Sequence, residues 1–221
     1  AKDIENKCFR PVSQAFFEDP LRALRVARFK AQFPKFFLHE SMEQALVKIS
    51  ASNELLNLSS ERVWGEVVKG LGHDFHQFLQ IIKNYNLHEP WFNKLSKIPD
   101  INSDIAEIKW CEVSQANEFK FAMCLDIPKS YSKQLLLWKK FFNYDKNGDV
   151  SYKVKFFEDF SKNNLPDAIF TLQFFKDINL ECIPIIKEYA NLNFGALSSN
   201  KKQDLKSVKK QELKKIIEKY G

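Results

Sequence analysis

The sequence contains little glycine and proline and no long hydrophobic run. Only 6 glycines and 8 prolines occur among its 221 residues, and these two residue types are the ones that most often interrupt helices and mark turns. Their scarcity, with abundant leucine, lysine, phenylalanine and glutamate, favours helices. No apolar segment is long enough to span a bilayer, and no signal peptide is recognisable. We therefore expect no membrane partner.

Cysteine is also scarce, and its positions do not fit the common metal and redox motifs. Four cysteines are scattered along the chain, without a C-x-x-C pair and without histidines at metal-ligand spacing: Cys8, Cys111, Cys124 and Cys182. Such cysteines are typical of reduced and mostly buried thiols in a cytosolic protein. We therefore expect a cytoplasmic location.

The residue content is that of a globular helical protein. Hydrophobic residues make up 44% of the chain and charged residues 28%, which allows a sizeable core in one large domain or two small ones. Most of the 21 phenylalanines recur at helical spacing, so we assign them to the core. We expect an all-α multi-helix array and find no convincing pair of strands.

Helical periodicity and turn residues predict the individual elements. The expected helices cover residues 20–33, a segment starting near 40, then 60–72, 74–84, 103–126, a segment starting at 128, then 154–160, 166–175 and 182–189. Pro184 is expected near the start of the last of these, and residues 194–199 read as a linker. A lysine-rich helix is expected to follow.

The formal net charge of +6 is concentrated in that last segment. Residues 201–221 hold eight lysines and three acidic residues, so the other 200 residues sum to only +1. Four apolar residues of this segment fall on one helical side, by which we expect it to dock: Leu205, Val208, Ile216 and Tyr220. Four lysines fall mainly on the other side: Lys206, Lys209, Lys210 and Lys214. They are predicted to contact RNA phosphates, and an equally open alternative is a solvated lysine face.

The stretch from Glu18 to Phe29 combines helix punctuation with an unusual charge pattern. Asp19 followed by Pro20 is typical of a helix start, because aspartate accepts bonds from free amides and proline loses none at the first helical position. On a helical wheel, five charged residues gather in or beside one narrow arc: Glu18, Asp19, Arg22, Arg25 and Arg28. This clustering indicates a binding strip, although a Glu18–Arg22 pair is also typical of an ordinary exposed helix.

Four segments in the first third of the chain resemble the neck of class II tRNA nucleotidyltransferases. This family comprises the CCA-adding enzymes and their poly(A) polymerase relatives. The segments follow the family's order and approximate spacing: Asp3-Ile4, Phe9-Arg10-Pro11-Val12, Glu18-Asp19-Pro20-Leu21-Arg22-Ala23-Leu24-Arg25 and Leu58-Ser59-Ser60-Glu61-Arg62-Val63-Trp64. The resemblance rests on the ordered set of segments and not on the E-D-x-x-R core alone.

The resemblance implies that the E-D-x-x-R motif is a protein template for incoming CTP and ATP. A carboxylate only accepts hydrogen bonds and a guanidinium only donates them, so Asp19 and Arg22 could read the amine and ring nitrogen that cytosine and adenine share. Uracil and guanine present a carbonyl and a ring N–H instead. Glu18 is implied to orient the arginine, and Arg25 and Arg28 to help hold the nucleotide.

A later E-R motif of the family matches Glu61 and Arg62, which are implied to brace the neck helices and the template. The motifs of the family's catalytic head do not occur in this sequence: the glycine-rich phosphate loop, the D-x-D metal pair and the R-R-D motif. Magnesium-dependent phosphoryl transfer needs clustered acidic ligands. We therefore expect Mg²⁺ to belong to the head, and this chain to bind no metal or other cofactor and to be inactive alone.

The chain opens within a motif and without methionine, so we expect a fragment or a processed product. Four segments are predicted: a head-to-neck connector (1–17), a neck with the template helix (18–86), a helical body (87–197) and a basic tail helix (198–221). The expected function is the nucleotide-templating and tRNA-binding part of a CCA-adding enzyme, whose partners are tRNA, CTP, ATP and its own head. A poly(A) polymerase part, or a helical RNA-binding or scaffold module without a nucleotide site, are the alternatives.

Two further motifs invite metal-site interpretations that the sequence does not support. His73-Asp74 with His76 imitates a metal phosphohydrolase motif, but nothing supports ligation by His39, the only upstream histidine. Asp74 is expected to cap a helix instead. Residues 145–149 imitate the start of a calcium loop, but valine and phenylalanine replace its turn glycine and its bidentate glutamate. We expect a turn there.

Overall fold

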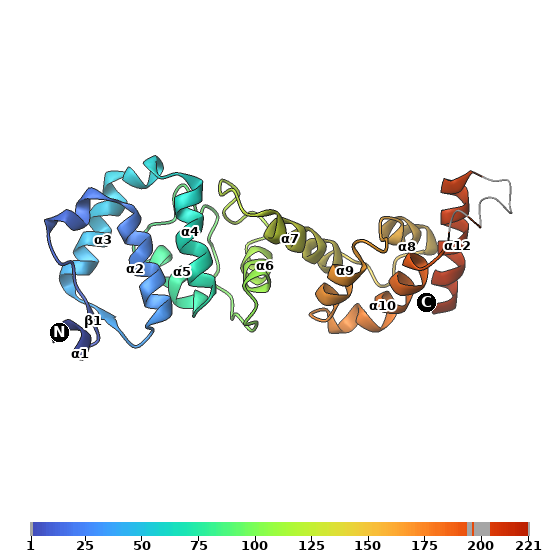
Figure 1. The fold of residues 1–221 in the computed structure, drawn as a ribbon, viewed down its shortest axis with the longest axis horizontal. Helices are drawn as coiled ribbons and strands as arrows, with labels where there is room; N and C mark the ends of the chain where they lie inside the picture. Colours follow the sequence, from blue (N-terminus) through green and yellow to red (C-terminus); the bar gives the residue numbers. More distant parts are fainter. Residues whose placement is uncertain (1, 194–195, 197–203, 221) are drawn as a thin grey trace. The chain divides into compact units, whose positions relative to one another are not determined.

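A computed structural model of the chain describes residues 2–193, 196 and 204–220. These residues form helices joined by connections of different lengths (Figure 1), and the expectation of an all-α array is confirmed. The chain divides into two compact units, Ala1–Leu135 and Leu136–Gly221. The boundary between the two units falls within a helix. The division into four functional segments is a separate expectation and stays a prediction. Among the described helices none is long and apolar enough to cross a membrane.

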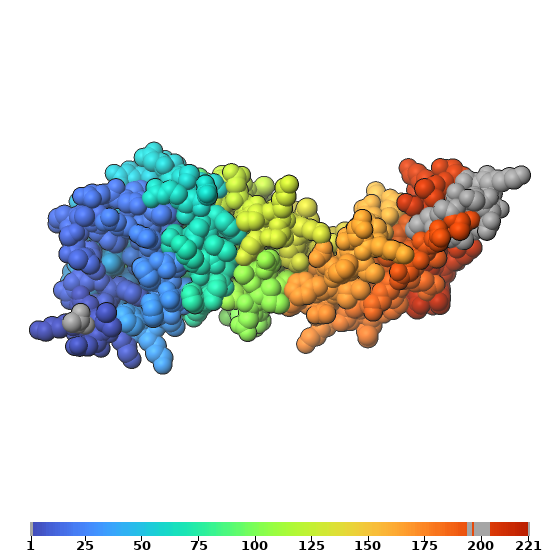
Figure 2. Space-filling view, viewed as in Figure 1, coloured from blue at the N-terminus to red at the C-terminus, as the bar shows by residue number. Residues whose placement is uncertain are grey.

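The first unit is a helical array around one hydrophobic core. Its elements in chain order are α1 (Lys2–Glu5), β1 (Cys8–Phe9), the 3₁₀ helix η1 (Gln14–Glu18), α2 (Leu21–Gln32), β2 (Phe37–Leu38), α3 (Glu40–Ser52), the 3₁₀ helix η2 (Glu54–Asn57), α4 (Ser60–Leu71), α5 (Phe75–Asn84), α6 (Ala106–Ala116) and the start of α7 (Lys129–Phe142). Helix α2 packs against α4 and α5, and its fully buried Leu24 and Ala27 belong to the core. Helix α1 lies on the surface of the unit (Figure 2).

Side-chain caps set the starts of α3, α4 and α5. The Ser59 hydroxyl accepts from the amide of Arg62 at 3.4 Å, and Oδ1 of Asp74 accepts from the amide of Gln77 at 3.3 Å. The cap at Asp74 was predicted and is confirmed. His39 caps α3 through Nδ1, which accepts from the amide of Ser41 at 3.1 Å. Histidine is not among the preferred capping residues, so the sequence did not predict this third cap.

The expectation of no strand pair is wrong in one place. Strands β1 and β2 form a parallel pair in which Cys8 lies opposite Phe37 and Phe9 lies opposite Leu38. Two residues per strand are too few to produce an alternating pattern, which needs at least four residues to be recognised. The pair ties the N-terminal segment to the chain just after α2, and so places residues 9–13 beside that helix.

The second unit has its own core of aromatic and aliphatic side chains. Its elements are the remainder of α7, then α8 (Val150–Phe157), α9 (Leu165–Leu172), α10 (Lys176–Ala190) and α12 (Leu205–Tyr220). Helix α8 begins four residues earlier than predicted, because Oδ1 of Asp149 caps it by accepting from the amide of Tyr152 at 2.7 Å. Helix α10 also begins earlier, so Pro184 lies inside it and not near its start. Apart from Ala196, the expected linker lies outside the described residues.

Helix α12 docks by a side that overlaps the predicted one only in part. Val208 and Ile216 are buried as predicted, whereas Leu205 is 44% exposed and Tyr220 is 39% exposed. Leu213 and Ile217 are buried in their place. The exposed residues lie at the two ends of the helix, where its contact with α8 and α10 does not cover them. The helical side was therefore correctly predicted at its centre and wrong at its ends.

Candidate functional site

Asp19 marks the start of α2. Its backbone is extended (φ −136°, ψ 106°), whereas Pro20 already has helical dihedrals (φ −61°, ψ −21°). Oδ1 of Asp19 accepts from the amide of Leu21 at 3.1 Å, so the predicted cap is present. Oδ2 of the same carboxylate lies 2.8 Å from Nη2 of Arg62 on α4. The carboxylate is thus held by α2 on one side and by α4 on the other.

Glu18 and Arg22 do not share a helix. Glu18 is the last residue of η1 and is exposed, whereas Arg22 is half-buried in the first turn of α2. Nη1 of Arg22 donates to the backbone carbonyl of Ala15. Within the described part of the chain no ion pair joins Glu18 to Arg22. The helical wheel had placed Glu18 on the same helix as Arg22, but Glu18 lies in η1, before α2 begins.

Arg25 and Arg28 converge on a buried glutamate, Glu66, that is not among the predicted site residues. Nε of Arg28 lies 2.6 Å from Oε2 of Glu66, and Nε of Arg25 lies 3.9 Å from Oε1. Lys69 adds a third cation at 3.5 Å. The Arg28 guanidinium also lies 4.0 Å from the centroid of the Phe29 ring. The signal in the sequence was the position of Glu66, one residue before the core residue Val67. A carboxylate that is buried at such a position needs a cationic partner.

A cavity of about 440 Å³ lies beside the start of α2. Arg22 and Arg25 line it together with Arg10, which the sequence analysis had placed in a family motif but not in a site. The other lining residues are mostly apolar or aromatic: Phe9, Pro11, Val12, Ser13, Phe16, Val26, Phe29 and Met42. Three guanidinium groups on an aromatic-lined cavity favour an anionic ligand with a flat ring.

The other predicted site residues lie outside this cavity. Asp19 and Arg28 do not line it, and neither does Glu18. Glu61 is exposed in the first turn of α4, next to the Arg62 that pairs with Asp19. The structure therefore separates the predicted strip into a cavity-facing part, Arg22 with Arg25, and a part that connects α2 with α4.

The four predicted lysines lie on α12, in the second unit. Lys206 is exposed and Lys209 is half-buried. Nζ of Lys210 lies 4.0 Å from Oε2 of Glu158, and Nζ of Lys214 lies 3.8 Å from Oε1 of Glu218. These are long, exposed ion pairs of the kind that contribute little to stability.

The two motifs set aside in the sequence have local structural roles. Asp74 caps α5, and Nδ1 of His76 lies 3.3 Å from the carbonyl of Pro99. No group of three or more histidine, cysteine, aspartate or glutamate side chains placed to hold a metal ion occurs within residues 2–193, 196 and 204–220. The 145–149 segment is a turn closed by the amide of Gly148 on the carbonyl of Asp145 at 3.1 Å, as predicted.

Comparison with known proteins gives matches to CCA-adding proteins. The chain is 48% identical over 86 residues to the CCA-adding enzyme of Hamiltonella defensa, which covers 38% of this chain and 21% of that protein. It is 40% identical over 97 residues to the multifunctional CCA protein of Pseudoalteromonas atlantica, covering 42% and 24%. The match to the multifunctional CCA protein of Hahella chejuensis is 31% over 165 residues, covering 66% and 39%. No family model and no solved structure matches the chain.

The chain is thus a helical protein with an arginine-lined cavity beside its second α-helix. Its matched part is homologous to a portion of the CCA-adding enzymes, and the resemblance seen in the motifs is confirmed. The matches span between 21% and 39% of the length of these three relatives.

Proposed function

We propose that this chain is the nucleotide-selecting and tRNA-holding part of a CCA-adding enzyme, acting in the cytoplasm. One observation supports this above the others. The chain is homologous to CCA-adding enzymes over its matched part. Arg22 and Arg25 belong to the helix that Asp19 caps, and both line the cavity beside its start. Cations beside aromatic rings suit a nucleoside triphosphate, which is a polyanion with a flat base.

Arg22, which lines the cavity, and Asp19, which lies three residues earlier and outside the lining, are the proposed readers of the base. Each carboxylate oxygen has two lone pairs, so the Asp19 oxygens can accept a further bond after those from Leu21 and Arg62. The Arg22 guanidinium has five N–H donors, and one of them serves the carbonyl of Ala15. An acceptor and a donor one turn apart match the pairing edges of cytosine and adenine and mismatch those of uracil and guanine.

The remaining predicted residues are assigned supporting roles. Arg25 and Arg28 hold the nucleotide, Glu18 orients the template, and Glu61 with Arg62 braces it. The α12 lysines contact the phosphates of tRNA: Lys206, Lys209, Lys210 and Lys214. Mg²⁺ is bound by a catalytic head that is this chain's partner in the intact enzyme, because this sequence has no D-x-D pair.

The chain alone is therefore proposed to add no nucleotide. The assay supplies purified chain with Mg²⁺, CTP, ATP and a tRNA that lacks its terminal CCA. The expected result is no product above the protein-free background, and labelled tRNA that accumulates with chain concentration would contradict the proposal.

Nucleotide choice is tested after fusion of the chain to the head of a CCA-adding relative. Arg22→Ala should lower kcat/KM for CTP and for ATP by roughly tenfold or more, because an unpaired polar group in a site costs about 1–3 kcal/mol. Lys35→Ala is the charge-matched control, because Lys35 is exposed and does not line the cavity. Equal rates for Arg22→Ala and the control would sink the template proposal, and use of ATP alone would favour a poly(A) polymerase.

A further inference from the structure

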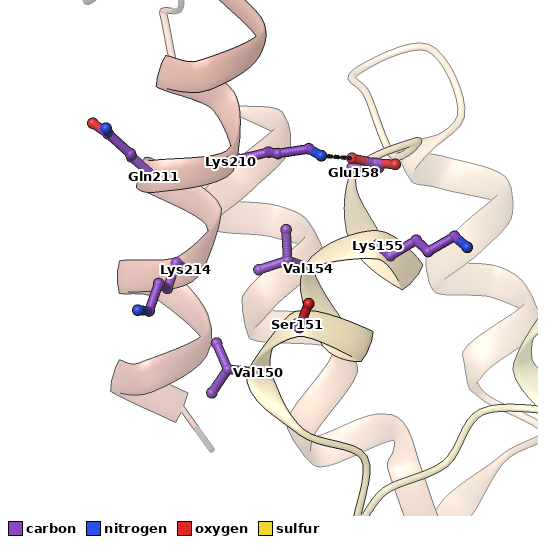
Figure 3. Close-up of a pocket in the computed structure, with 8 residues that line it drawn as sticks. All are labelled: Val150, Ser151, Val154, Lys155, Glu158, Lys210, Gln211 and Lys214. Atoms are coloured by element: carbon purple, nitrogen blue, oxygen red, sulfur yellow. Dashed lines mark ion pairs between the residues drawn. The ribbon is translucent and has the colours of Figure 1, made fainter.

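A cavity of about 540 Å³ between α8 and α12, within the second unit, has charged groups that do not converge (Figure 3). Lys210 reaches across to Glu158, whereas Lys155 and Lys214 extend to opposite sides. A cavity of about 470 Å³ in the first unit is arranged differently. It is lined by the junction of α4 and α5, by the connection before α6 and by α6 itself, and we call it the α5–α6 cavity. Five of its lining residues are ionisable: His73, Asp74, His76, Asp104 and Lys109.

Lys109 brings a buried positive charge to the α5–α6 cavity. It is 7% exposed, and its ammonium donates to the backbone carbonyl of His73 at 2.7 Å. Among the residues that the structure describes, no ion pair joins Lys109 to a carboxylate, and Glu112 acts on it only at longer range. An ammonium has three N–H donors, and a buried charge needs partners. Two donors of Lys109 are therefore available to an acceptor on a ligand.

Asp104 supplies acceptors to the same cavity. It is exposed in the connection before α6, and its carboxylate has no hydrogen-bond or ion-pair partner within the described part of the chain. The Asp19 oxygens, in contrast, already accept from Leu21 and Arg62. A carboxylate with both oxygens free can accept two parallel N–H bonds, as it does from a guanidinium group.

The two histidines contribute a neutral wall and a free ring. Nδ1 of His76 lies 3.3 Å from the carbonyl of Pro99, and Nε2 lies 2.9 Å from Nε2 of Gln80. Because a carbonyl only accepts, Nδ1 carries the proton and Nε2 accepts, so the His76 ring is neutral. His73 is exposed, and its ring forms no hydrogen bond with the residues described. Its face is therefore available to stack on a base.

We propose that the α5–α6 cavity binds a guanine base, either of a free nucleoside or of an unpaired residue in RNA. The N1–H and N2–H groups of guanine are parallel donors that match the two free oxygens of Asp104, and its O6 is an acceptor for Lys109. Since Asp104 and Lys109 form no ion pair with each other, a base can lie between them. Adenine and cytosine have an amine beside a bare ring nitrogen, and uracil has a single ring N–H. None of these three bases gives a carboxylate two parallel bonds.

The charge of the α5–α6 cavity distinguishes its ligand from a nucleoside triphosphate. Three arginines line the cavity beside α2, whereas here Asp74 and Asp104 outnumber Lys109. The phosphates of GTP are therefore repelled, and guanosine should bind more tightly than GTP. This inference does not depend on the function proposed above.

Titration calorimetry of the purified 221-residue chain with guanosine tests the proposal. Inosine lacks only the exocyclic amine of guanosine and should bind roughly tenfold more weakly, because one bond to Asp104 is lost. Asp104→Asn should weaken guanosine binding to a similar extent, because its amide directs an N–H toward a base N–H. Asp100→Asn is the matched control, since Asp100 is exposed in the same connection and does not line the cavity. Lys109→Met should also weaken binding, and Asp104→Asn carries the test if that variant does not fold.

Single-stranded UUGUU and UUAUU distinguish the two sources of the base. Tighter binding of UUGUU than of both UUAUU and guanosine assigns the cavity to RNA, whereas binding of guanosine without a preference for UUGUU assigns it to a free nucleoside. The proposal is overturned if neither guanosine nor UUGUU is preferred over its matched ligand, or if Asp104→Asn and Asp100→Asn have equal effects. Loss of guanosine binding in Arg22→Ala but not in Asp104→Asn would also overturn it, and would place the base in the cavity beside α2.

Discussion

Nε of Arg28 on α2 lies 2.6 Å from Oε2 of Glu66 on α4, and the Glu66 side chain is only 6% exposed. The same carboxylate lies 3.9 Å from Arg25, whose side chain also lines the proposed nucleotide cavity. A buried carboxylate on α4 therefore sets the position of two arginines on α2. The Arg62–Asp19 pair at 2.8 Å joins the same two helices at the start of α2.

Removing the Glu66 carboxylate should destabilise the first unit. Glu66→Ala leaves Arg28, which is 15% exposed, without its counter-charge, and breaking a buried pair costs about 3–5 kcal/mol. Glu66→Gln should cost less, because its amide oxygen can still accept from Nε of Arg28. Urea denaturation of the chain measures both changes. Glu118→Gln, which breaks the exposed pair with Lys120, is the control and should leave the transition unchanged.

The Asp19–Arg62 pair should matter more for selectivity than for stability. The side chains are 30% and 50% exposed, so Arg62→Ala should lower the free energy of unfolding by no more than about 1 kcal/mol. In the chain fused to the head of a CCA-adding relative, the same change frees the Asp19 carboxylate to rotate. Misincorporation of UTP and GTP should therefore rise. Asp19→Asn keeps a good helix cap but adds an N–H donor that can pair with the uracil or guanine carbonyl.

Asp19→Asn should therefore also relax selectivity without unfolding the helix. Misincorporation is measured with each nucleotide alone, and circular dichroism reports the helix content. If both variants keep wild-type selectivity, the Asp19–Arg62 pair is only a structural link between α2 and α4.

The helix starts were predictable because a cap and its amide lie within three residues of each other. Asp19, Ser59 and Asp74 each satisfy an amide two or three positions ahead, so the local sequence contains both partners. The β1–β2 pair joins residues 29 positions apart, Cys8 and Phe37, and no local pattern specifies it. Its formation depends on how α2 directs the chain back toward the N-terminal segment.

The candidate site shows the same contrast between contacts that are local in the sequence and contacts that are distant in it. The arginines of α2 were predicted from a short motif, but their partner Glu66 lies 38 residues from Arg28. Arg10 reaches the cavity because the β1–β2 pair holds its segment beside α2. Residues that share a helix were thus predictable from the local sequence, whereas those that the tertiary fold brings to them were not.

The stability of the first unit should fall in alkaline solution through Tyr131. This side chain is 6% exposed and packs against Trp64 with ring centroids 4.8 Å apart. Burial, and to a lesser extent the charge of Glu107, raises the pKa of Tyr131 to about 12. Because its folded pKa is above the unfolded value, its contribution is fully present below about pH 10 and is lost as pH rises to about 12.

Tyr131→Phe removes the ionisable hydroxyl group and keeps the aromatic ring. Between about pH 10 and 12 the wild-type chain should lose up to about 1.4 kcal/mol per pH unit more than the variant. Urea denaturation at several pH values measures the difference. Parallel pH profiles for the two proteins would show that Tyr131 ionises as readily in the folded chain as in the unfolded one.

Docking of α12 can be tested by two leucines on the same helix. Leu213 is fully buried and belongs to the core of the second unit, whereas Leu205 is 44% exposed at the start of the helix. Leu213→Ala should lower the free energy of unfolding by about 2–5 kcal/mol, because it removes buried methyl groups and leaves a cavity. Leu205→Ala should cost less than about 0.5 kcal/mol, as surface substitutions usually do.

Both variants replace leucine by alanine in the same helix, so helix propensity changes equally and only burial differs. Urea denaturation followed by circular dichroism measures both. A larger loss for Leu205→Ala than for Leu213→Ala would mean that α12 docks by the side predicted from the sequence, which contains Leu205 and not Leu213.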